Sequence, residues 1–282
     1  MTATVKLRVN EPSMTVARFR RIVWAYYKEH GRHTLPWRAT QDPYKILVSE
    51  VMLQQTQVER VIPFYKSFIK QFPTAKKLSA APLAEVLIAW QGLGYNRRAK
   101  MLQTATKELV GMNFSTRSNL VEELEKLPGV GPYTARAVAA FALNENVVFV
   151  ETNIRTAIIQ HFFADKEDVR DEEIEEVLQR ALPRGKAREW YSALMDYGTS
   201  LKRSGISHNT KSVTYTKQPA FTGSLREARG AILRELSQGA TSSTRLTNLL
   251  GDARRAQMRE ALRALFTEGL IKKEGANYAL AN

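Results

Sequence analysis

The chain has 282 residues, which is enough for one large domain or two modest ones. It carries 42 Lys and Arg against 28 Asp and Glu, a formal charge of +14, and this excess favours a polyanionic partner such as nucleic acid, although a ribosomal or membrane-surface protein would share it. Cysteine is absent, so disulfides, thiol catalysis and thiolate-bound zinc or iron–sulfur clusters are excluded. No apolar run of about 18 residues and no cleavable leader is present, so we expect an intracellular, cytoplasmic protein with no membrane partner.

The first two thirds of the chain have the pattern of consecutive helices. Residues 1–13 are polar, and we expect a flexible N-terminus there. Residues 14–30 carry the apolar stripe of an amphipathic helix, and further helical patterns cover 44–72, with a break near Pro63, and 83–111 with a glycine turn inside it. No alternation typical of a β-strand occurs before about residue 270. We therefore predict an all-α domain over residues 14–201.

A glycine hairpin, Leu127-Pro-Gly-Val-Gly-Pro-Tyr-Thr134, joins two of these helical patterns. Gly129 and Gly131 permit positive φ and leave backbone amides uncovered by side chains. Amides at the start of the second helix, together with the positive end of its dipole, suit an anion such as a DNA phosphate. The pattern predicts a helix-hairpin-helix; an ordinary helical hairpin of an all-α protein is the alternative.

The segment Ser49–Val58 places one acid close to two amides, Gln54 and Gln55. Glu50 is flanked by apolar residues, so if its side chain points inward its pKa should rise and it could hold a proton near neutral pH. An exposed helical glutamate is the alternative.

Two shorter segments also carry candidate groups. Tyr95 follows a glycine turn and precedes Arg97 and Arg98, a combination that suits stacking on a base beside neutralised phosphates, although a helix C-cap with a packed tyrosine is equally consistent. Glu151 and Asn153 lie at the start of a predicted helix, where Thr152 or Asn153 could simply act as its N-cap.

The C-terminal part changes character. Residues 202–217 contain basic but no acidic residues and many small polar ones, which predicts a basic linker or a DNA-facing strap. Residues 218–282 show helical patterns over 224–236, 244–250 and 252–268, then two short strands around Glu274-Gly275. This order resembles a winged helix; a helical oligomerisation appendage is the alternative.

Taken together, the segments Leu35–Arg38, Asp42–Tyr44, Ser49–Val58, Trp90–Arg98, Leu127–Ala135 and Glu151–Arg155 resemble the helix-hairpin-helix (HhH-GPD) DNA glycosylases, and within them the MutY-type adenine glycosylases most closely. The resemblance spans about 15–203, and SEVMLQQTQV is its most specific piece. It implies a two-lobed glycosylase domain that flips a mispaired base, most of all adenine opposite 8-oxoguanine or guanine, out of double-stranded DNA and hydrolyses its N-glycosidic bond in base excision repair. The alternatives are a thymine or uracil mismatch glycosylase, a non-catalytic DNA-structure-binding protein, and a repressor-like regulator.

The resemblance also assigns roles to residues. Glu50 corresponds to the acid that protonates the adenine, and Glu151 to a second acid that stabilises the oxocarbenium-like sugar or adds to it, with Tyr133 and Asn153 beside it. Bifunctional relatives have lysine where Tyr133 stands, so the resemblance implies a monofunctional enzyme without AP-lyase activity. The remaining assignments are base recognition and duplex insertion by Arg38, Gln54, Gln55 and Tyr95, and DNA phosphate contacts at Gly129, Gly131, Arg97, Arg98, Lys202 and Arg203.

Some residues depart from the family pattern, and these departures bear on the cofactor and the base specificity that we expect. Glu151 stands where the family has aspartate, and Asn96 replaces a second aromatic residue. Lys202 falls where the first cluster cysteine would be, so we expect no iron–sulfur cluster and no other cofactor, and the four histidines show no metal spacing. The backbone at Gly129–Gly131 is a candidate site for K⁺ or Na⁺. The C-terminal domain does not resemble the family's 8-oxoguanine-reading module, which implies a different opposite-base preference, and we expect a nucleoid-associated monomer.

Overall fold

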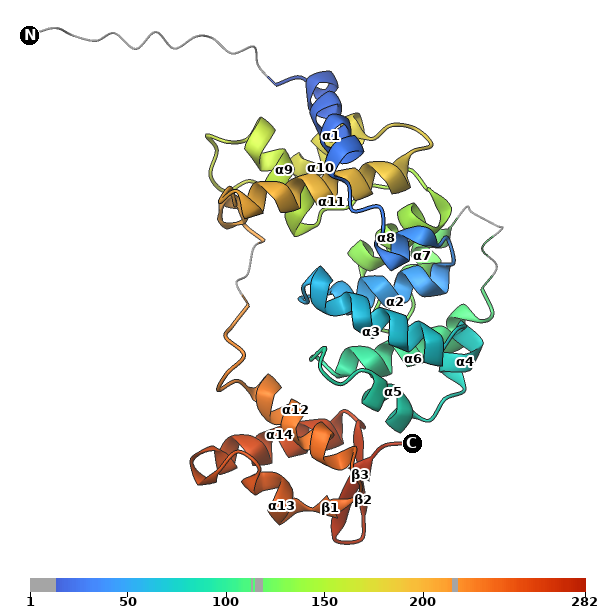
Figure 1. Ribbon diagram of the computed structural model, residues 1–282, viewed down its shortest axis with the longest axis vertical. Helices are drawn as coiled ribbons and strands as arrows, with labels where there is room; N and C mark the ends of the chain where they lie inside the picture. Colours follow the sequence, from blue (N-terminus) through green and yellow to red (C-terminus); the bar gives the residue numbers. More distant parts are fainter. Residues whose placement is uncertain (1–13, 113, 115–118, 215–217) are drawn as a thin grey trace, which may run out of the picture. The chain divides into compact units, whose positions relative to one another are not determined.

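The computed structural model describes residues 14–112, 114, 119–214 and 218–282. The predicted flexible N-terminus and the end of the predicted linker lie outside the described residues. The chain divides into two compact units, of which the first combines 1–32 with 148–215 and the second combines 33–147 with 216–282. Helices dominate both units, and a small three-stranded sheet follows near the C-terminus (Figure 1), which confirms the predicted fold class. No helix among the described residues combines the length and the hydropathy needed to cross a bilayer.

The first unit is a bundle built around α11. Its elements are α1 (Val16–His30), α9 (Thr152–Phe162), α10 (Asp171–Ala181), α11 (Ala187–Arg203) and the short 3₁₀ helix η2 (Asn209–Lys211). Helix α11 packs against both α1 and α9, and Phe19 and Trp190 are fully buried between these helices. The guanidinium of Arg20 caps the C-terminus of α10, where it donates to the carbonyls of Arg180 and Ala181 at 2.8 Å each. Backbone carbonyls in the last turn of a helix have no partner within the helix, and Arg20 satisfies two of them.

The helical part of the second unit centres on α2. Its elements are η1 (Pro36–Ala39), α2 (Pro43–Leu53), α3 (Val58–Gln71), α4 (Ala75–Ser79), α5 (Leu83–Ala89), α6 (Arg97–Leu109), α7 (Leu120–Glu125) and α8 (Pro132–Leu143). Helix α2 is buried along nearly its whole length, and its apolar residues are joined there by the buried polar residues Ser49 and Glu50. The expected break near Pro63 is wrong: Pro63 lies inside α3, and the chain turns at residues 54–57 instead.

Helices α7 and α8 and the hairpin between them confirm the predicted helix-hairpin-helix. Gly129 has φ +77°, and a β-carbon there would lie 2.7 Å from the Cβ of Met101, so both the conformation and the space require glycine. Gly131 is the N-cap of α8, and Pro132 occupies its first turn, where the missing N–H has no cost.

The C-terminal part has the element order of a winged helix. It consists of α12 (Leu225–Leu236), β1 (Thr241–Ser242), α13 (Ser243–Asn248), η3 (Asp252–Arg254), α14 (Arg255–Thr267), β2 (Ile271–Glu274) and β3 (Asn277–Leu280). The antiparallel sheet has the order β1-β3-β2, with Ile271 opposite Leu280. The predicted helices and hairpin are confirmed, and the two-residue strand β1 adds a third strand that the sequence pattern did not predict.

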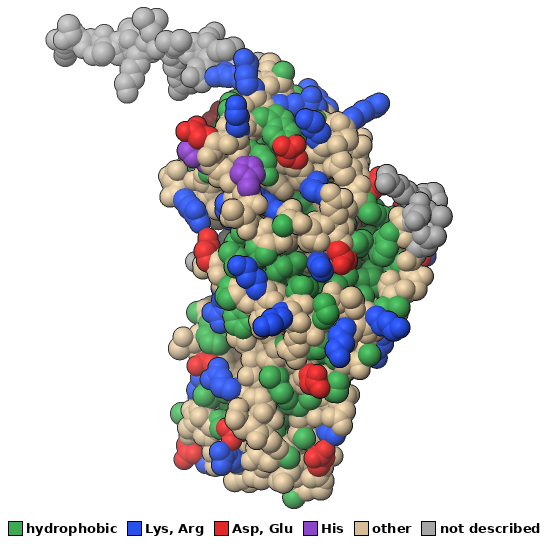
Figure 2. All heavy atoms as spheres, turned by 45° about the vertical axis from the view of Figure 1, so that its right-hand side comes forward, with side chains coloured by type: hydrophobic (Ala, Val, Ile, Leu, Met, Phe, Trp, Pro, Cys, Tyr) green, Lys and Arg blue, Asp and Glu red, His purple; other side chains and the backbone are tan. Residues whose placement is uncertain are grey.

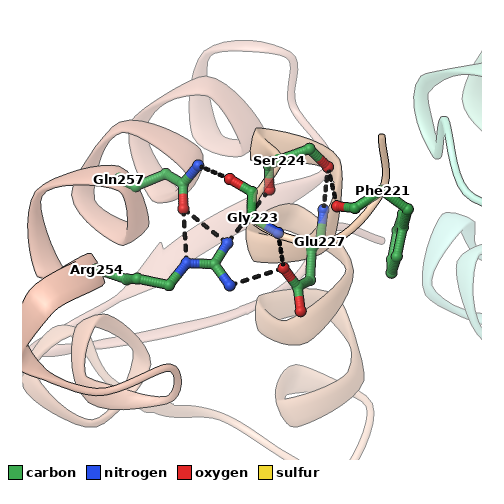
Figure 3. A network of polar contacts seen from close by, with 6 residues as sticks. All are labelled: Phe221, Gly223, Ser224, Glu227, Arg254 and Gln257. Carbon is green, nitrogen blue, oxygen red and sulfur yellow. Dashed lines mark hydrogen bonds and ion pairs between the residues drawn. The ribbon is translucent and has the colours of Figure 1, made fainter. Parts of the chain in front are cut away.

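A polar network fixes the start of α12 against α14 (Figure 3). Ser224 is the N-cap of α12, and the Glu227 carboxylate accepts from the backbone N–H of Gly223 and from Arg254, both at 2.7 Å. Gln257 donates back to the Gly223 carbonyl at 2.8 Å. The hydrogen bonds from the Gly223 backbone and from Arg254 hold the pKa of Glu227 below its ordinary value.

Candidate active site

Packing of α2 on α8 brings Glu50 together with Tyr133. Glu50 is only 5% exposed, and the Tyr133 hydroxyl donates to its Oε2 at 2.9 Å. The inward orientation expected for Glu50 is therefore confirmed, and the exposed alternative is wrong. Tyr133, which the resemblance placed beside the second acid, contacts the first one. Gln54 Nε2 lies 3.4 Å from the hydroxyl of Thr134 on the same pair of helices.

Glu151 is itself the N-cap of α9. Its Oε2 accepts from the backbone N–H of Asn153 at 2.7 Å, and its Oε1 accepts from the Thr152 hydroxyl at 2.6 Å and from the Asn153 side-chain amide at 3.1 Å. The alternative in which Thr152 or Asn153 caps the helix is thus wrong, because both donate to Glu151 instead. The Glu151 carboxylate therefore lies at the positive end of the α9 dipole and accepts three hydrogen bonds there.

Helix α11 packs against the start of α9, next to Glu151. Gly198 lets the two helices approach so closely that a β-carbon there would lie 2.0 Å from the Asn153 carbonyl oxygen. Arg155, one turn into α9, is 8% exposed and pairs with Asp171 at 2.9 Å, which ties α9 to α10. Lys202 interacts electrostatically with Glu151. Burial lowers the pKa of Lys202, and the Glu151 carboxylate opposes that shift.

Arg98 holds the two turns that carry Gln54 and Tyr95. Its guanidinium donates to the carbonyls of Val51 and Gln54 at the end of α2, at 2.7 and 2.6 Å, and to that of Gly94 at 3.1 Å. Burial lowers the pKa of Arg98 to about 10. Arg98 was expected at a DNA phosphate, but its donors are used by the protein backbone, so we assign it a positioning role.

The two residues expected to enter the duplex lie next to each other. Gln55 and Tyr95 have left-handed backbones, with φ +54° and +47°, which are uncommon for residues other than glycine. Gln218 Nε2 donates to the Tyr95 hydroxyl at 2.8 Å and lies 3.4 Å from Gln55 Oε1. The Tyr95 ring also faces two guanidinium groups, with Arg226 at 5.0 Å and Arg98 at 5.4 Å from its centroid.

A model of the HhH-GPD superfamily of base excision DNA repair proteins matches residues 48–184. The adenine DNA glycosylase of Mycolicibacterium smegmatis is 35% identical to the chain over an alignment that covers 90% of this chain and 93% of that protein. The chain belongs to the HhH-GPD superfamily. The adenine DNA glycosylase of Buchnera aphidicola (subsp. Baizongia pistaciae) is 36% identical, but the match covers 66% of the chain and only 53% of that longer protein. The structure of a thermostable thymine-DNA glycosylase has the same fold, with a TM-score of 0.56 and 23% identity over 64% of this chain and 87% of that one. The expected family of base excision repair glycosylases is thereby confirmed.

The second unit of this HhH-GPD protein contains a cavity of about 640 Å³ beside the insertion residues. Gln55, Tyr95, Arg97 and Gly129 contribute to its wall, and Arg226 and Arg229 contribute from α12. Val51 and Gln54 also line this cavity, whereas Glu50 does not. Sequence reasoning missed Gln218, Arg226 and Arg229, because only the folded chain brings them to Tyr95.

The other predicted contact residues lie at or near the surface. Arg97, Gly129, Gly131 and Arg203 are exposed, and Arg38 on η1 is half-buried. Lys and Arg side chains are spread over the face drawn in Figure 2, with Asp and Glu among them, so net charge alone does not locate a binding surface. The described part of the chain holds no group of three His, Asp or Glu side chains that could bind a metal ion.

Proposed function

We propose that the protein is a monofunctional DNA glycosylase that removes adenine opposite guanine or 8-oxoguanine. The observation that carries the proposal is the buried pair of Glu50 and Tyr133. Burial favours the neutral carboxylic acid, which can protonate a ring nitrogen of the leaving base. Once the proton has left, the Tyr133 hydroxyl donates to the carboxylate that forms. The names of the relatives, adenine DNA glycosylase, support adenine as the base.

Glu151 supplies the second acid of the proposed reaction. Its capping contacts fix the carboxylate at the start of α9, where it can stabilise the positive charge that develops on the sugar. One neutral and one charged acid is the division of labour that glycosidic hydrolysis requires. Tyrosine at position 133 cannot form a Schiff base, so the product is an intact strand with an abasic site.

The remaining assignments concern DNA binding. Arg38 and Gln54 contact the flipped base, Gln55 and Tyr95 enter the duplex, and Arg97, Lys202, Arg203 and the hairpin amides at Gly129 and Gly131 contact phosphates of a mismatched or oxidised duplex. We place a K⁺ or Na⁺ ion at the hairpin backbone, where the Leu127 and Gly131 carbonyls each accept one backbone hydrogen bond and keep a second lone pair. The protein acts as a monomer.

The test is single-turnover base release from duplexes that contain A opposite 8-oxoguanine, A opposite G, T opposite G and U opposite G, each followed by alkali. We expect release of adenine and strand cleavage only after alkali treatment. Glu50→Gln should abolish release, whereas the control Glu122→Gln, an exposed acid on α7, should leave it unchanged. Release of T or U would move the specificity to another base, and binding without any release would favour a non-catalytic DNA-binding protein.

A further inference from the structure

Helix α14 carries a row of arginines on one face. Arg255, Arg259 and Arg263 are spaced four residues apart, and with Phe266 they fall within an arc of about 80° on a helix of 3.6 residues per turn. The acid of this helix, Glu260, lies outside the arc, about 60° beyond Arg263. The face therefore presents positive charge without an interspersed carboxylate.

A groove of about 510 Å³ runs along this face. Helix α13 contributes Ser243, Thr244, Thr247 and Asn248 to the lining of this groove, and the Thr247 hydroxyl donates to the Thr244 carbonyl at 3.2 Å. Phe266, which is 50% exposed, and Tyr278 also line the groove, and their rings pack edge to face with centroids 6.3 Å apart. The groove thus combines cationic, hydroxyl and aromatic groups on a single surface, which we call the α14 surface.

The arginines of the C-terminal part differ in how their charge is used. Arg229, Arg245 and Arg254 pair with Glu268, Glu235 and Glu227 at 2.5–2.7 Å. Arg255 is also engaged, since it pairs with Asp252 and donates to Asn248 Oδ1 at 2.9 Å. Arg259 and Arg263 are exposed and make no hydrogen bond or ion pair with any described residue. The unpaired guanidiniums of α14 are therefore those that face the groove.

We propose that the α14 surface binds the phosphate backbone of duplex DNA, at a place separate from the glycosylase site. Free guanidiniums bind phosphate oxygens in a bidentate manner, and serine and threonine hydroxyls commonly contact phosphate and sugar. Arg259 and Arg263 are one helical turn apart, about 6 Å along the axis, so each reaches a different phosphate. An acidic protein would match the charge as well, but the serine and threonine residues that line the same groove as the arginines favour a phosphate backbone.

The test compares the salt dependence of binding to an undamaged 40-base-pair duplex, measured by fluorescence anisotropy between 50 and 250 mM KCl. Each phosphate contact contributes about 0.9 to the slope of log K against log salt, so Arg259→Ala with Arg263→Ala should reduce the slope by about two and weaken binding roughly tenfold at 150 mM. The matched control removes two exposed charges that lie outside the groove, Arg234→Ala with Lys273→Ala, and should change the slope much less.

Equal slopes for the wild type and the Arg259/Arg263 variant, or an equal loss in the control, would overturn the proposal and leave an acidic protein as the partner to seek. The inference is separable from the proposed function, because binding to undamaged DNA needs no excision. At saturating protein, the Arg259/Arg263 variant should release adenine at the wild-type rate if that function is correct. A wild-type protein that releases no base but shows the predicted difference in slope would refute the proposed function alone.

Discussion

The contact of α11 with the start of α9 offers a direct test of how Glu151 is held. Replacing Gly198 by alanine would put a β-carbon 2.0 Å from the Asn153 carbonyl oxygen and 2.9 Å from its Cα. Both are backbone atoms, which cannot rotate away as a flexible side chain could. Ordinary contact begins near 3.4 Å, so in a close-packed interior the first turn of α9 must move by about 1.4 Å.

This movement carries Glu151 and Asn153 with it. A misplacement of about 1 Å at a reacting centre costs on the order of a hundredfold in rate, and we expect Gly198→Ala to slow single-turnover adenine release by about that factor. The strain should also lower the free energy of unfolding by about 1–3 kcal/mol, as overpacking does in other cores. Rapid-quench kinetics at saturating protein measure the first quantity, and urea unfolding measures the second.

Gly230→Ala is the matched control. Gly230 lies inside α12, and a β-carbon there would meet no atom within 4 Å. The substitution should therefore raise stability by about 0.5–1 kcal/mol and leave the rate unchanged. If Gly198→Ala lost stability but kept the wild-type rate, the position of Glu151 would not limit catalysis. If it changed neither quantity, α9 and α11 would not pack as described.

Three other predictions concern the second unit. Arg98→Lys should lower the free energy of unfolding by about 2 kcal/mol in urea, because one ammonium cannot serve carbonyls of both turns, and a loss below about 0.5 kcal/mol would contradict this. Gln218→Ala should raise the rate of association with a mismatched duplex about fivefold in stopped-flow experiments, since freeing Tyr95 removes a hydrogen bond of about 1 kcal/mol; an unchanged rate would show that this contact does not gate DNA entry. The hydrogen bond from Arg229 holds the pKa of Glu268 below its ordinary value, so the stability gained from the pair is present above about pH 4.3 and is lost as the pH falls through the lower, folded-state pKa. The urea midpoints of the wild type and of Arg229→Ala should therefore differ at pH 7 and converge near pH 3. A gap between the midpoints that stayed constant with pH would refute this.

Much of the fold follows from patterns that act locally. The helix-hairpin-helix was predictable because two glycines and a proline specify the turn, and the burial of Glu50 because its neighbours on α2 are apolar. Pro63 misled the prediction because α3 continues through it, although a proline at the sixth position of a helix removes one backbone hydrogen bond. Strand β1 has only two residues, too few for any alternation to show.

The site depended more on tertiary contacts that the sequence does not display. Arg97 and Arg98 look alike as neighbours, yet on a helix adjacent residues point about 100° apart, so one faces solvent and the other faces the end of α2. Gln218 and Arg226 reach Tyr95 from more than 120 residues away in the sequence. Contacts between residues so far apart in the sequence depend on the tertiary fold, and no local sequence pattern predicts them.

The strained turns and Arg98 together explain how the insertion residues are prepared for DNA. Left-handed backbones at Gln55 and Tyr95 cost of order 1 kcal/mol or more each, and such conformations persist only where the surroundings determine them. The hydrogen bonds from Arg98 to carbonyls on both turns provide that determination. Two side chains fixed before DNA arrives lose less conformational entropy on binding, which favours affinity. Arg98 should thus influence DNA binding without touching DNA, while phosphate contact in this segment falls to its exposed neighbour, Arg97.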